Sequence, residues 1–177
     1  MEIFSMSYLC PLAVAAVSLF IATGCAAQTE TGTMPVIVDG ADYLLSVSVT
    51  NKRAKSGWSE AVPSFDQVSV NGFLEKGGAI DMNVYVSFGV LTMNGAQTIT
   101  DADIILTERG TEGGWMTVDS DDPVVTLTTY EKSDAGVLVE GSFSGAPDYR
   151  KSLYKMTDER GAVRTVSGSF SILYPAK

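Results

Sequence analysis

The feature that most constrains the fold of this chain is a long stretch in which apolar and polar side chains alternate. Every second position carries an apolar side chain: Ile80, Met82, Val84, Val86, Phe88 and Val90. Successive side chains of a strand point to opposite faces, whereas a helix would spread this pattern around its surface. The stretch therefore predicts a strand with one face in a core.

Further strands are predicted where β-branched and aromatic residues cluster. They lie at residues 45–49, 104–107, 115–118, 124–130, 137–143 and 163–174. The pairs Asn71-Gly72 and Asn94-Gly95 are each flanked by strand-forming residues and tolerate the positive φ angles of a type I′ turn, so we predict a hairpin at each. The pattern predicts an all-β domain of about eight to ten strands, an antiparallel β-sandwich or, alternatively, a small β-barrel.

A short sequence occurs twice. The order Val-x-Gly-Ser-Phe-Ser is found at 139–144 and again at 166–171. In a strand, the Val, Gly and Phe of each copy share one face. We predict two strands with matching inward faces, in which glycine leaves room for a neighbouring ring.

The N-terminal region differs from the rest in charge. No charged side chain lies between Glu2 and Glu30, and residues 12–22 are apolar or small. This pattern is typical of a secretory signal peptide, although an uncharged segment of this length also permits a membrane span.

The segment ends in Ala22-Thr23-Gly24-Cys25, which resembles the lipobox of bacterial lipoproteins. The family usually carries Leu where this chain has Ala22. The resemblance implies that Cys25 is lipidated and becomes the first mature residue. Because Ala26 rather than Asp follows, it also implies an outer-membrane location.

These observations predict a signal peptide at 1–24, a lipidated cysteine and polar tether at 25–34, and one domain at 35–177. The second copy of the repeated sequence resembles the closing strand of small uncharacterised bacterial β-sandwich lipoproteins, which implies a fold and no function. Two alternatives for the N-terminal region stay open: cleavage after Ala27 with release of a soluble periplasmic or secreted domain, and an uncleaved anchor.

The amino-acid composition excludes several kinds of catalytic and metal-binding site. The chain has no histidine, and its only cysteines are Cys10 and Cys25 in the leader, so Ser-His-Asp, Cys-His and zinc-histidine sites are excluded. A net charge of −9 argues against a nucleic-acid partner. The clustered aspartates at 39–42, 101–103 and 119–122 fit turn chemistry better than a calcium site. No catalytic residue, metal ligand or cofactor is predicted.

Five side chains are candidates for binding. Trp58 and Trp115 lie beside turn residues, where an indole can stack on a sugar or anchor a protein contact, although packing in the core is the alternative. The others are basic side chains in a stretch without strand signals: Arg150, Lys151 and Lys155. Such a group can rest on anionic lipid or simply face water.

The combined reading is a non-enzymatic envelope lipoprotein that acts as a binding or structural and assembly component with a protein partner. A periplasmic inhibitor or immunity-type protein is one alternative, because acidic charge suits a basic partner. A carbohydrate-binding module that uses Trp58 or Trp115 is the other.

Overall fold

The computed structural model describes residues 32–176 except for 51–54, 118–122 and 154–160. These residues form eleven strands and no helix. The strands are β1 (Gly32–Val38), β2 (Ala41–Val47), β3 (Gly57–Val62), β4 (Phe65–Lys76), β5 (Ala79–Met93), β6 (Ala96–Glu108), β7 (Gly114–Met116), β8 (Val124–Ser133), β9 (Gly136–Gly145), β10 (Asp148–Arg150) and β11 (Val166–Pro175). The predicted all-β class is confirmed.

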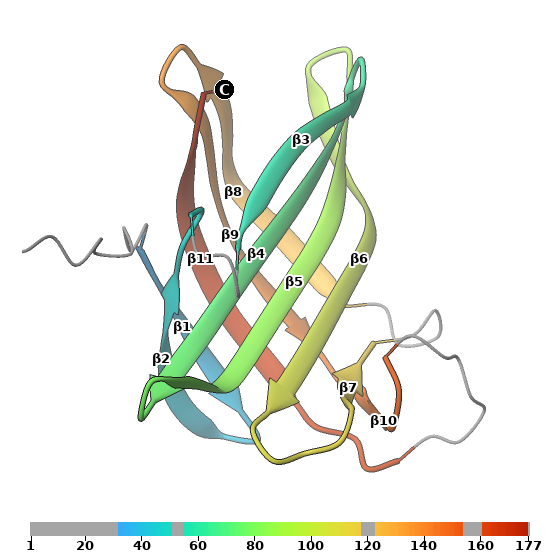
Figure 1. Ribbon diagram of the computed structural model, residues 1–177. Helices are drawn as coiled ribbons and strands as arrows, with labels where there is room; N and C mark the ends of the chain where they lie inside the picture. The colour runs from blue at the N-terminus through green and yellow to red at the C-terminus, as the bar shows by residue number, and fades with distance from the viewer. Residues whose placement is uncertain (1–31, 51–54, 118–122, 154–160, 177) are drawn as a thin grey trace, which may run out of the picture.

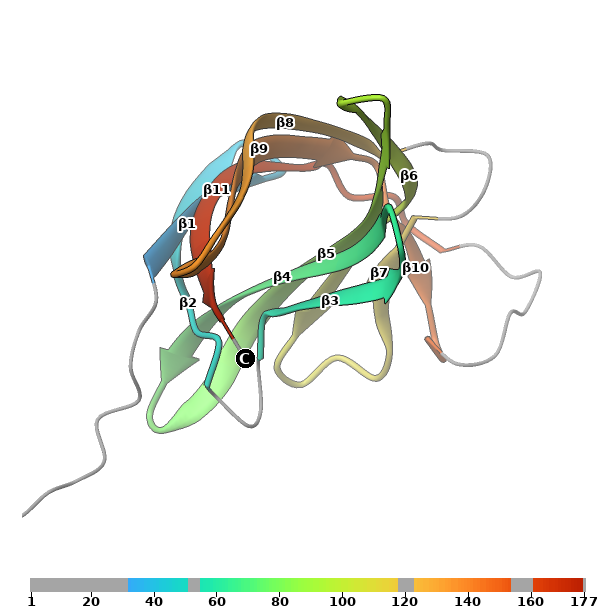
Figure 2. The same cartoon turned by 90° about the horizontal axis from the view of Figure 1, so that it is seen from above.

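The strands pair antiparallel in one continuous sheet. Its order is β10-β7-β6-β5-β4-β2-β1-β11-β9-β8, and β3 pairs with β4. The sheet curves so that β3 to β6 form one layer and β1, β11, β9 and β8 face them (Figures 1 and 2). It does not close into a barrel, so the fold is sandwich-like.

The two layers meet in a core of aliphatic and aromatic side chains. The alternating stretch predicted from sequence is β5, and its apolar positions point inward. Phe88 of β5 stacks on Phe170 of β11, with ring centroids 5.9 Å apart, and Phe170 lies 6.4 Å from Phe143 of β9. These rings join the layers, because each loses its water-exposed apolar area to the facing sheet.

The repeated sequence forms two neighbouring strands, β9 and β11. In their antiparallel register, Gly141 lies opposite Phe170 and Gly168 opposite Phe143. A Cβ atom at Gly168 would lie 2.7 Å from the Phe143 ring, and one at Gly141 would lie 3.1 Å from the Phe170 ring. Each copy thus supplies the space that the ring of the other copy needs, as predicted.

The two predicted Asn-Gly hairpins have different outcomes. Asn94 and Gly95 join β5 to β6 with φ angles of 51° and 79°, which confirms that turn. The hairpin predicted at Asn71-Gly72 is wrong, because both residues lie inside β4 and the chain turns later. Gly72 serves packing instead: an added Cβ would collide with the side chain of Met34.

The first strand of the described structure overlaps the predicted tether. β1 begins at Gly32, inside the stretch 25–34 that was predicted as tether. The signal segment and Cys25 lie outside the described residues. In the part of the chain that the structure describes, no helix is long and apolar enough to cross a membrane.

Candidate functional site

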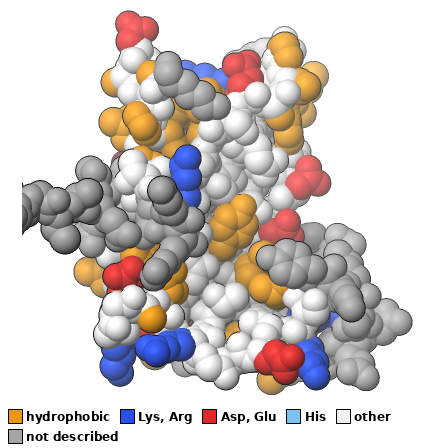
Figure 3. Space-filling view, in the orientation of Figure 1, with side chains coloured by type: hydrophobic (Ala, Val, Ile, Leu, Met, Phe, Trp, Pro, Cys, Tyr) orange, Lys and Arg blue, Asp and Glu red, His pale blue; other side chains and the backbone are white. Residues whose placement is uncertain are grey.

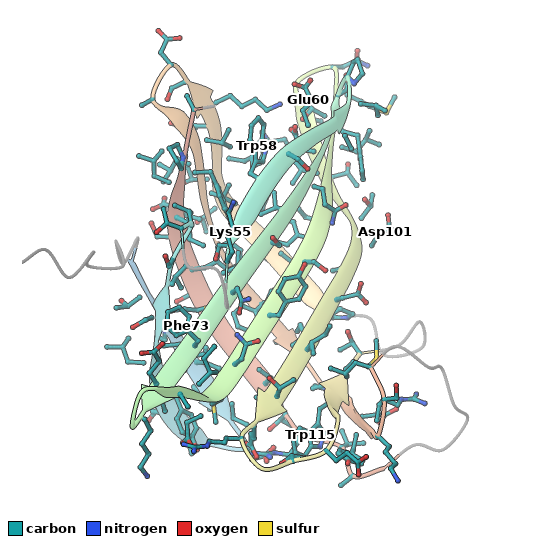
Figure 4. All side chains as sticks on the ribbon, in the orientation of Figure 1. Lys55, Trp58, Glu60, Phe73, Asp101 and Trp115 are labelled. Atoms are coloured by element: carbon teal, nitrogen blue, oxygen red, sulfur yellow. The ribbon has the colours of Figure 1, made fainter. Side chains whose placement is uncertain are left out.

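Trp58 lies in a chain of polar contacts that joins the two layers near one end of the sandwich (Figure 4). Its indole N–H donates to the Tyr130 hydroxyl of β8 at 3.1 Å, and that hydroxyl donates to Asp66 of β4 at 2.6 Å. Lys132 Nζ lies 2.8 Å from Asp66 Oδ2 and 5.4 Å from the centroid of the Trp58 ring. The ring is therefore held in one orientation by side chains of two other strands, β4 and β8.

Asp66 is the centre of these contacts. Its side chain is 1% exposed, so its charge has to be compensated by protein groups rather than by water. Lys132 supplies the opposite charge, and Tyr130 supplies a hydroxyl donor. Burial, together with the hydrogen bond to Asp66, raises the pKa of Tyr130. The phenol therefore stays protonated and keeps donating to the carboxylate.

Trp58 is half-buried and lines a pocket of about 200 Å³ between β3 and the end of β11. Lys55, just before β3, lines the same pocket and is exposed. Figure 4 places the two residues along the same side of β3. Among the described residues, no ion pair involves Lys55.

Trp115, the second candidate tryptophan, lies at the opposite end of the molecule (Figure 4). It is only 9% exposed and belongs to the core. The Tyr149 ring meets it edge-on at 5.4 Å, and the Arg164 guanidinium lies 5.0 Å from its centroid. This geometry supports the core-packing alternative, because the neighbours already cover the indole.

Arg164 also holds two carboxylates. It pairs with Glu108 of β6 at 3.2 Å and with Asp39 of the β1–β2 turn. Asp39 also accepts a hydrogen bond from the Thr165 backbone N–H at 2.7 Å. That bond is the largest cause that lowers the pKa of Asp39, and the charge of Arg164 lowers it further. These contacts join the turn to the segment that leads into β11.

The three basic candidates do not form one exposed group in the described structure. Arg150 of β10 is buried, with its guanidinium 3.8 Å from Asp148. Lys151 is 77% exposed and lies 3.9 Å from Glu112, which is equally exposed. Lys155 lies outside the described residues. Of this candidate group, the described structure therefore exposes Lys151 alone.

Sequence reasoning missed Asp66, Tyr130 and Lys132. Asp66 is separated from the other two by 64 and 66 positions. An acidic residue beside a predicted strand is ordinary, and pairing across two layers leaves no local signal. The alternation in β8 does place Tyr130 on a strand, but gives no indication of its partner.

Apolar side chains and serines form a surface on the outer side of the second layer. One row crosses β8, β9, β11, β1 and β2, in the order Val124, Ser144, Ser167, Ile37 and Asp42. Ile37 is 44% exposed, Val124 59%, and Leu44, on the next row, 63%. We call this surface, defined by Ile37, Leu44, Val124 and the serines between them, the Ile37 face.

Two hollows of about 480 and 600 Å³ lie on the Ile37 face, and Ile37 lines both. Among the described residues that line them, Asp42 carries the sole charge. The opposite side of the molecule, over β3 to β6, carries charged side chains mainly toward its edges and two ends (Figure 3). The Ile37 face combines exposed apolar side chains with two hollows whose described lining contains a single charged residue.

No group of three or more metal-ligating side chains occurs within the described ranges. The aspartates at 119, 121 and 122 lie outside those ranges. Asp39 is engaged by Thr165 and Arg164, as the turn interpretation of its cluster requires.

Comparison with known proteins adds no relative. No protein-family model, curated protein or solved structure matches the chain. Any functional conclusion therefore depends on the side chains described above.

Proposed function

We propose that this chain is a lipoprotein of the bacterial envelope, anchored at Cys25, whose β-sandwich binds a protein partner through the Ile37 face. The observation that carries the proposal is the exposure of Ile37, Leu44 and Val124 on one face beside two hollows. Covering apolar area of this kind contributes roughly 25 cal/mol per Å².

The form of the face suits a protein surface. Serines lie between the apolar side chains and supply short hydrogen-bonding groups that cost little side-chain entropy to order. Apolar patches rimmed by polar residues mark protein contacts in soluble domains. The absence of lysine and arginine from the lining of the two hollows, in the part of the chain described, favours an uncharged or basic partner surface.

The anchor supports a partner at the membrane. Gly32, where β1 begins, is seven positions after Cys25. A chain of that length spans at most about 25 Å. A lipid on Cys25 would therefore keep the sandwich close to the bilayer and raise its effective concentration toward other envelope proteins.

The anchor is tested by the intact mass of the protein isolated from membranes, with Cys25→Ala as the control. The proposal predicts a chain that starts at Cys25 and carries the extra mass of lipid, which the variant loses. A chain that starts at Gln28 without added mass would contradict the lipid anchor.

The face is tested by a photoreactive side chain placed at Leu44 in cells. Met93, which is 62% exposed on the β5–β6 hairpin, is the matched control site for Leu44 at 63%. We expect one dominant protein adduct from position 44 and none from position 93, and we expect Ile37→Lys to abolish it. Equal adducts from both positions, or an adduct unchanged by Ile37→Lys, would contradict binding through this face.

A further inference from the structure

The pocket beside Trp58 exists because the sheet changes partners there. The pairing of β2 with β4 ends at Val47, and that of β3 with β4 begins at Gly57. The end of β11 faces this junction, and the Tyr174 hydroxyl reaches across to donate to the Ser69 carbonyl at 2.9 Å. The resulting pocket of about 200 Å³ is lined chiefly by Val49, Lys55, Ser56, Trp58, Tyr174 and Pro175.

The aromatic wall of this pocket is fixed before any ligand arrives. Trp58 is tied through Tyr130 to the buried Asp66, and Lys132 lies over part of its ring. A side chain locked by such supporting contacts loses little entropy on binding. The side of Trp58 that lines the pocket is therefore held in a fixed orientation.

The polar groups of the pocket complement an anion and hydroxyls. Lys55 is exposed at the pocket and has no ion pair among the described residues. The Ser56 hydroxyl is buried and accepts a hydrogen bond from the Asn71 backbone N–H at 2.9 Å, so the exposed polar side chain of the lining is Lys55, whose ammonium has three N–H donors.

The volume of the pocket limits the size of the ligand. A volume of 200 Å³ is below the roughly 300–1,000 Å³ of pockets for drug-sized molecules, so a single ring fits. A sugar ring combines an apolar C–H face, which can lie on an indole, with hydroxyls that need donors and acceptors at its edge. A carboxylate on the ring would pair with Lys55.

We propose that the Trp58 pocket binds an acidic sugar, with the ring on the indole of Trp58 and the carboxylate at Lys55. This site is separate from the Ile37 face, with which it shares no lining residue. The protein would thus carry two binding surfaces of different chemistry.

The experiment titrates the full chain in detergent with glucuronic acid and with glucose, and follows the indole N–H signals by NMR. Trp115→Phe identifies which signal belongs to Trp58. We expect glucuronic acid to shift the Trp58 signal alone, with a Kd on the order of 1 mM. We expect glucose, which lacks the charge, to bind about fivefold more weakly.

Two variants complete the test. Lys55→Ala should weaken the binding of glucuronic acid about fivefold and leave the binding of glucose unchanged. Lys151 is also an exposed lysine and lies at the other end of the molecule, so Lys151→Ala should change the affinity for neither sugar. Neither substitution removes a core side chain, so both variants fold. The expected Kd is roughly 1 mM, so 20 mM glucuronic acid should nearly saturate the site. A Trp58 signal that does not move at that concentration would overturn the proposal. Equal binding of the two sugars, or an unchanged Lys55→Ala, would also overturn it.

Discussion

The two tryptophans of this domain have similar neighbours but differ in burial, because Trp58 is half-buried and Trp115 is buried. Each has a tyrosine beside it and a cation over its ring, Lys132 for Trp58 and Arg164 for Trp115. Trp115 is covered by these groups and belongs to the core, whereas Trp58 keeps a side that lines a pocket. Similar kinds of side chain thus cover the indole at one end of the sandwich and leave a pocket beside it at the other.

The difference arises from the strands around each indole. Trp115 lies on β7, between β6 and β10, and segments on both sides pack against it. Trp58 lies at the start of β3, where the pairing along β4 passes from β2 to β3. The pocket beside Trp58 lies where the pairing along β4 changes partner, whereas the strands around Trp115 are continuous.

The largest expected effect is the loss of stability when each tryptophan is replaced by alanine. Trp115→Ala removes a buried ring and should lower the free energy of unfolding by about 4 kcal/mol, the range for aromatic truncation in a core. Trp58→Ala should cost about 2 kcal/mol, because the ring is half-buried. Urea denaturation followed by circular dichroism measures both. Equal losses would mean that Trp58 is as much a core residue as Trp115.

The next effect concerns the charges beside the rings. Asp66→Ala should cost about 3 kcal/mol, because it leaves the buried Tyr130 hydroxyl and Lys132 without their acceptor. Lys132→Ala should cost about 1 kcal/mol, since the lysine side chain is 45% exposed and Asp66 keeps the Tyr130 hydrogen bond. Thermal and urea unfolding measure the loss of stability in each variant. Equal losses for the two variants would mean that Asp66 and Lys132 form a simple exposed ion pair.

At the covered end, Arg164→Lys keeps the charge but removes the planar group that lies over Trp115 and pairs with two carboxylates. We expect a loss of about 1 kcal/mol. Lys151→Arg, on an exposed pair, is the matched control and should stay within about 0.5 kcal/mol. If Arg164→Lys loses no more stability than the control, the planar guanidinium of Arg164 does not stabilise this end of the sandwich.

The smallest effect is a dependence on pH at the same end. The pKa of Asp39 is lowered from its ordinary 3.8, so its contribution to stability is present above that value and is lost as pH falls through the folded-state pKa. The side chain is 44% exposed, so solvent screening keeps the contribution below about 1 kcal/mol. Stability measured from neutral to acid pH should fall less in Asp39→Asn than in the wild type. Parallel curves would show that Asp39 makes no such contribution.

Features that depend on neighbours along the chain could be predicted from sequence. The alternation from Ile80 to Val90 identified β5, and Asn94-Gly95 identified its turn. The repeated Val-x-Gly-Ser-Phe-Ser predicted two strands with matching faces, and their side-by-side register follows from the reciprocal fit of glycine and phenylalanine.

Features that depend on distant packing could not be predicted in this way. Asn71-Gly72 has the local sequence of a turn, yet Gly72 is required where Met34 crosses β4. Trp115 follows two glycines, so the sequence left open whether its indole is exposed or packed in the core, and residues from elsewhere in the chain bury it. The contacts of Asp66 join residues more than sixty positions apart, so no local sequence pattern predicts them.

The contrast between an open and a covered indole is tested most directly by acrylamide quenching of tryptophan fluorescence in two single-tryptophan variants. Trp115→Phe leaves Trp58 as the only fluorophore, and Trp58→Phe leaves Trp115. The account predicts a quenching constant several-fold larger for Trp58 than for Trp115, because Trp58 is half-buried beside a pocket whereas Trp115 is 9% exposed. Equal constants, or stronger quenching of Trp115, would contradict it.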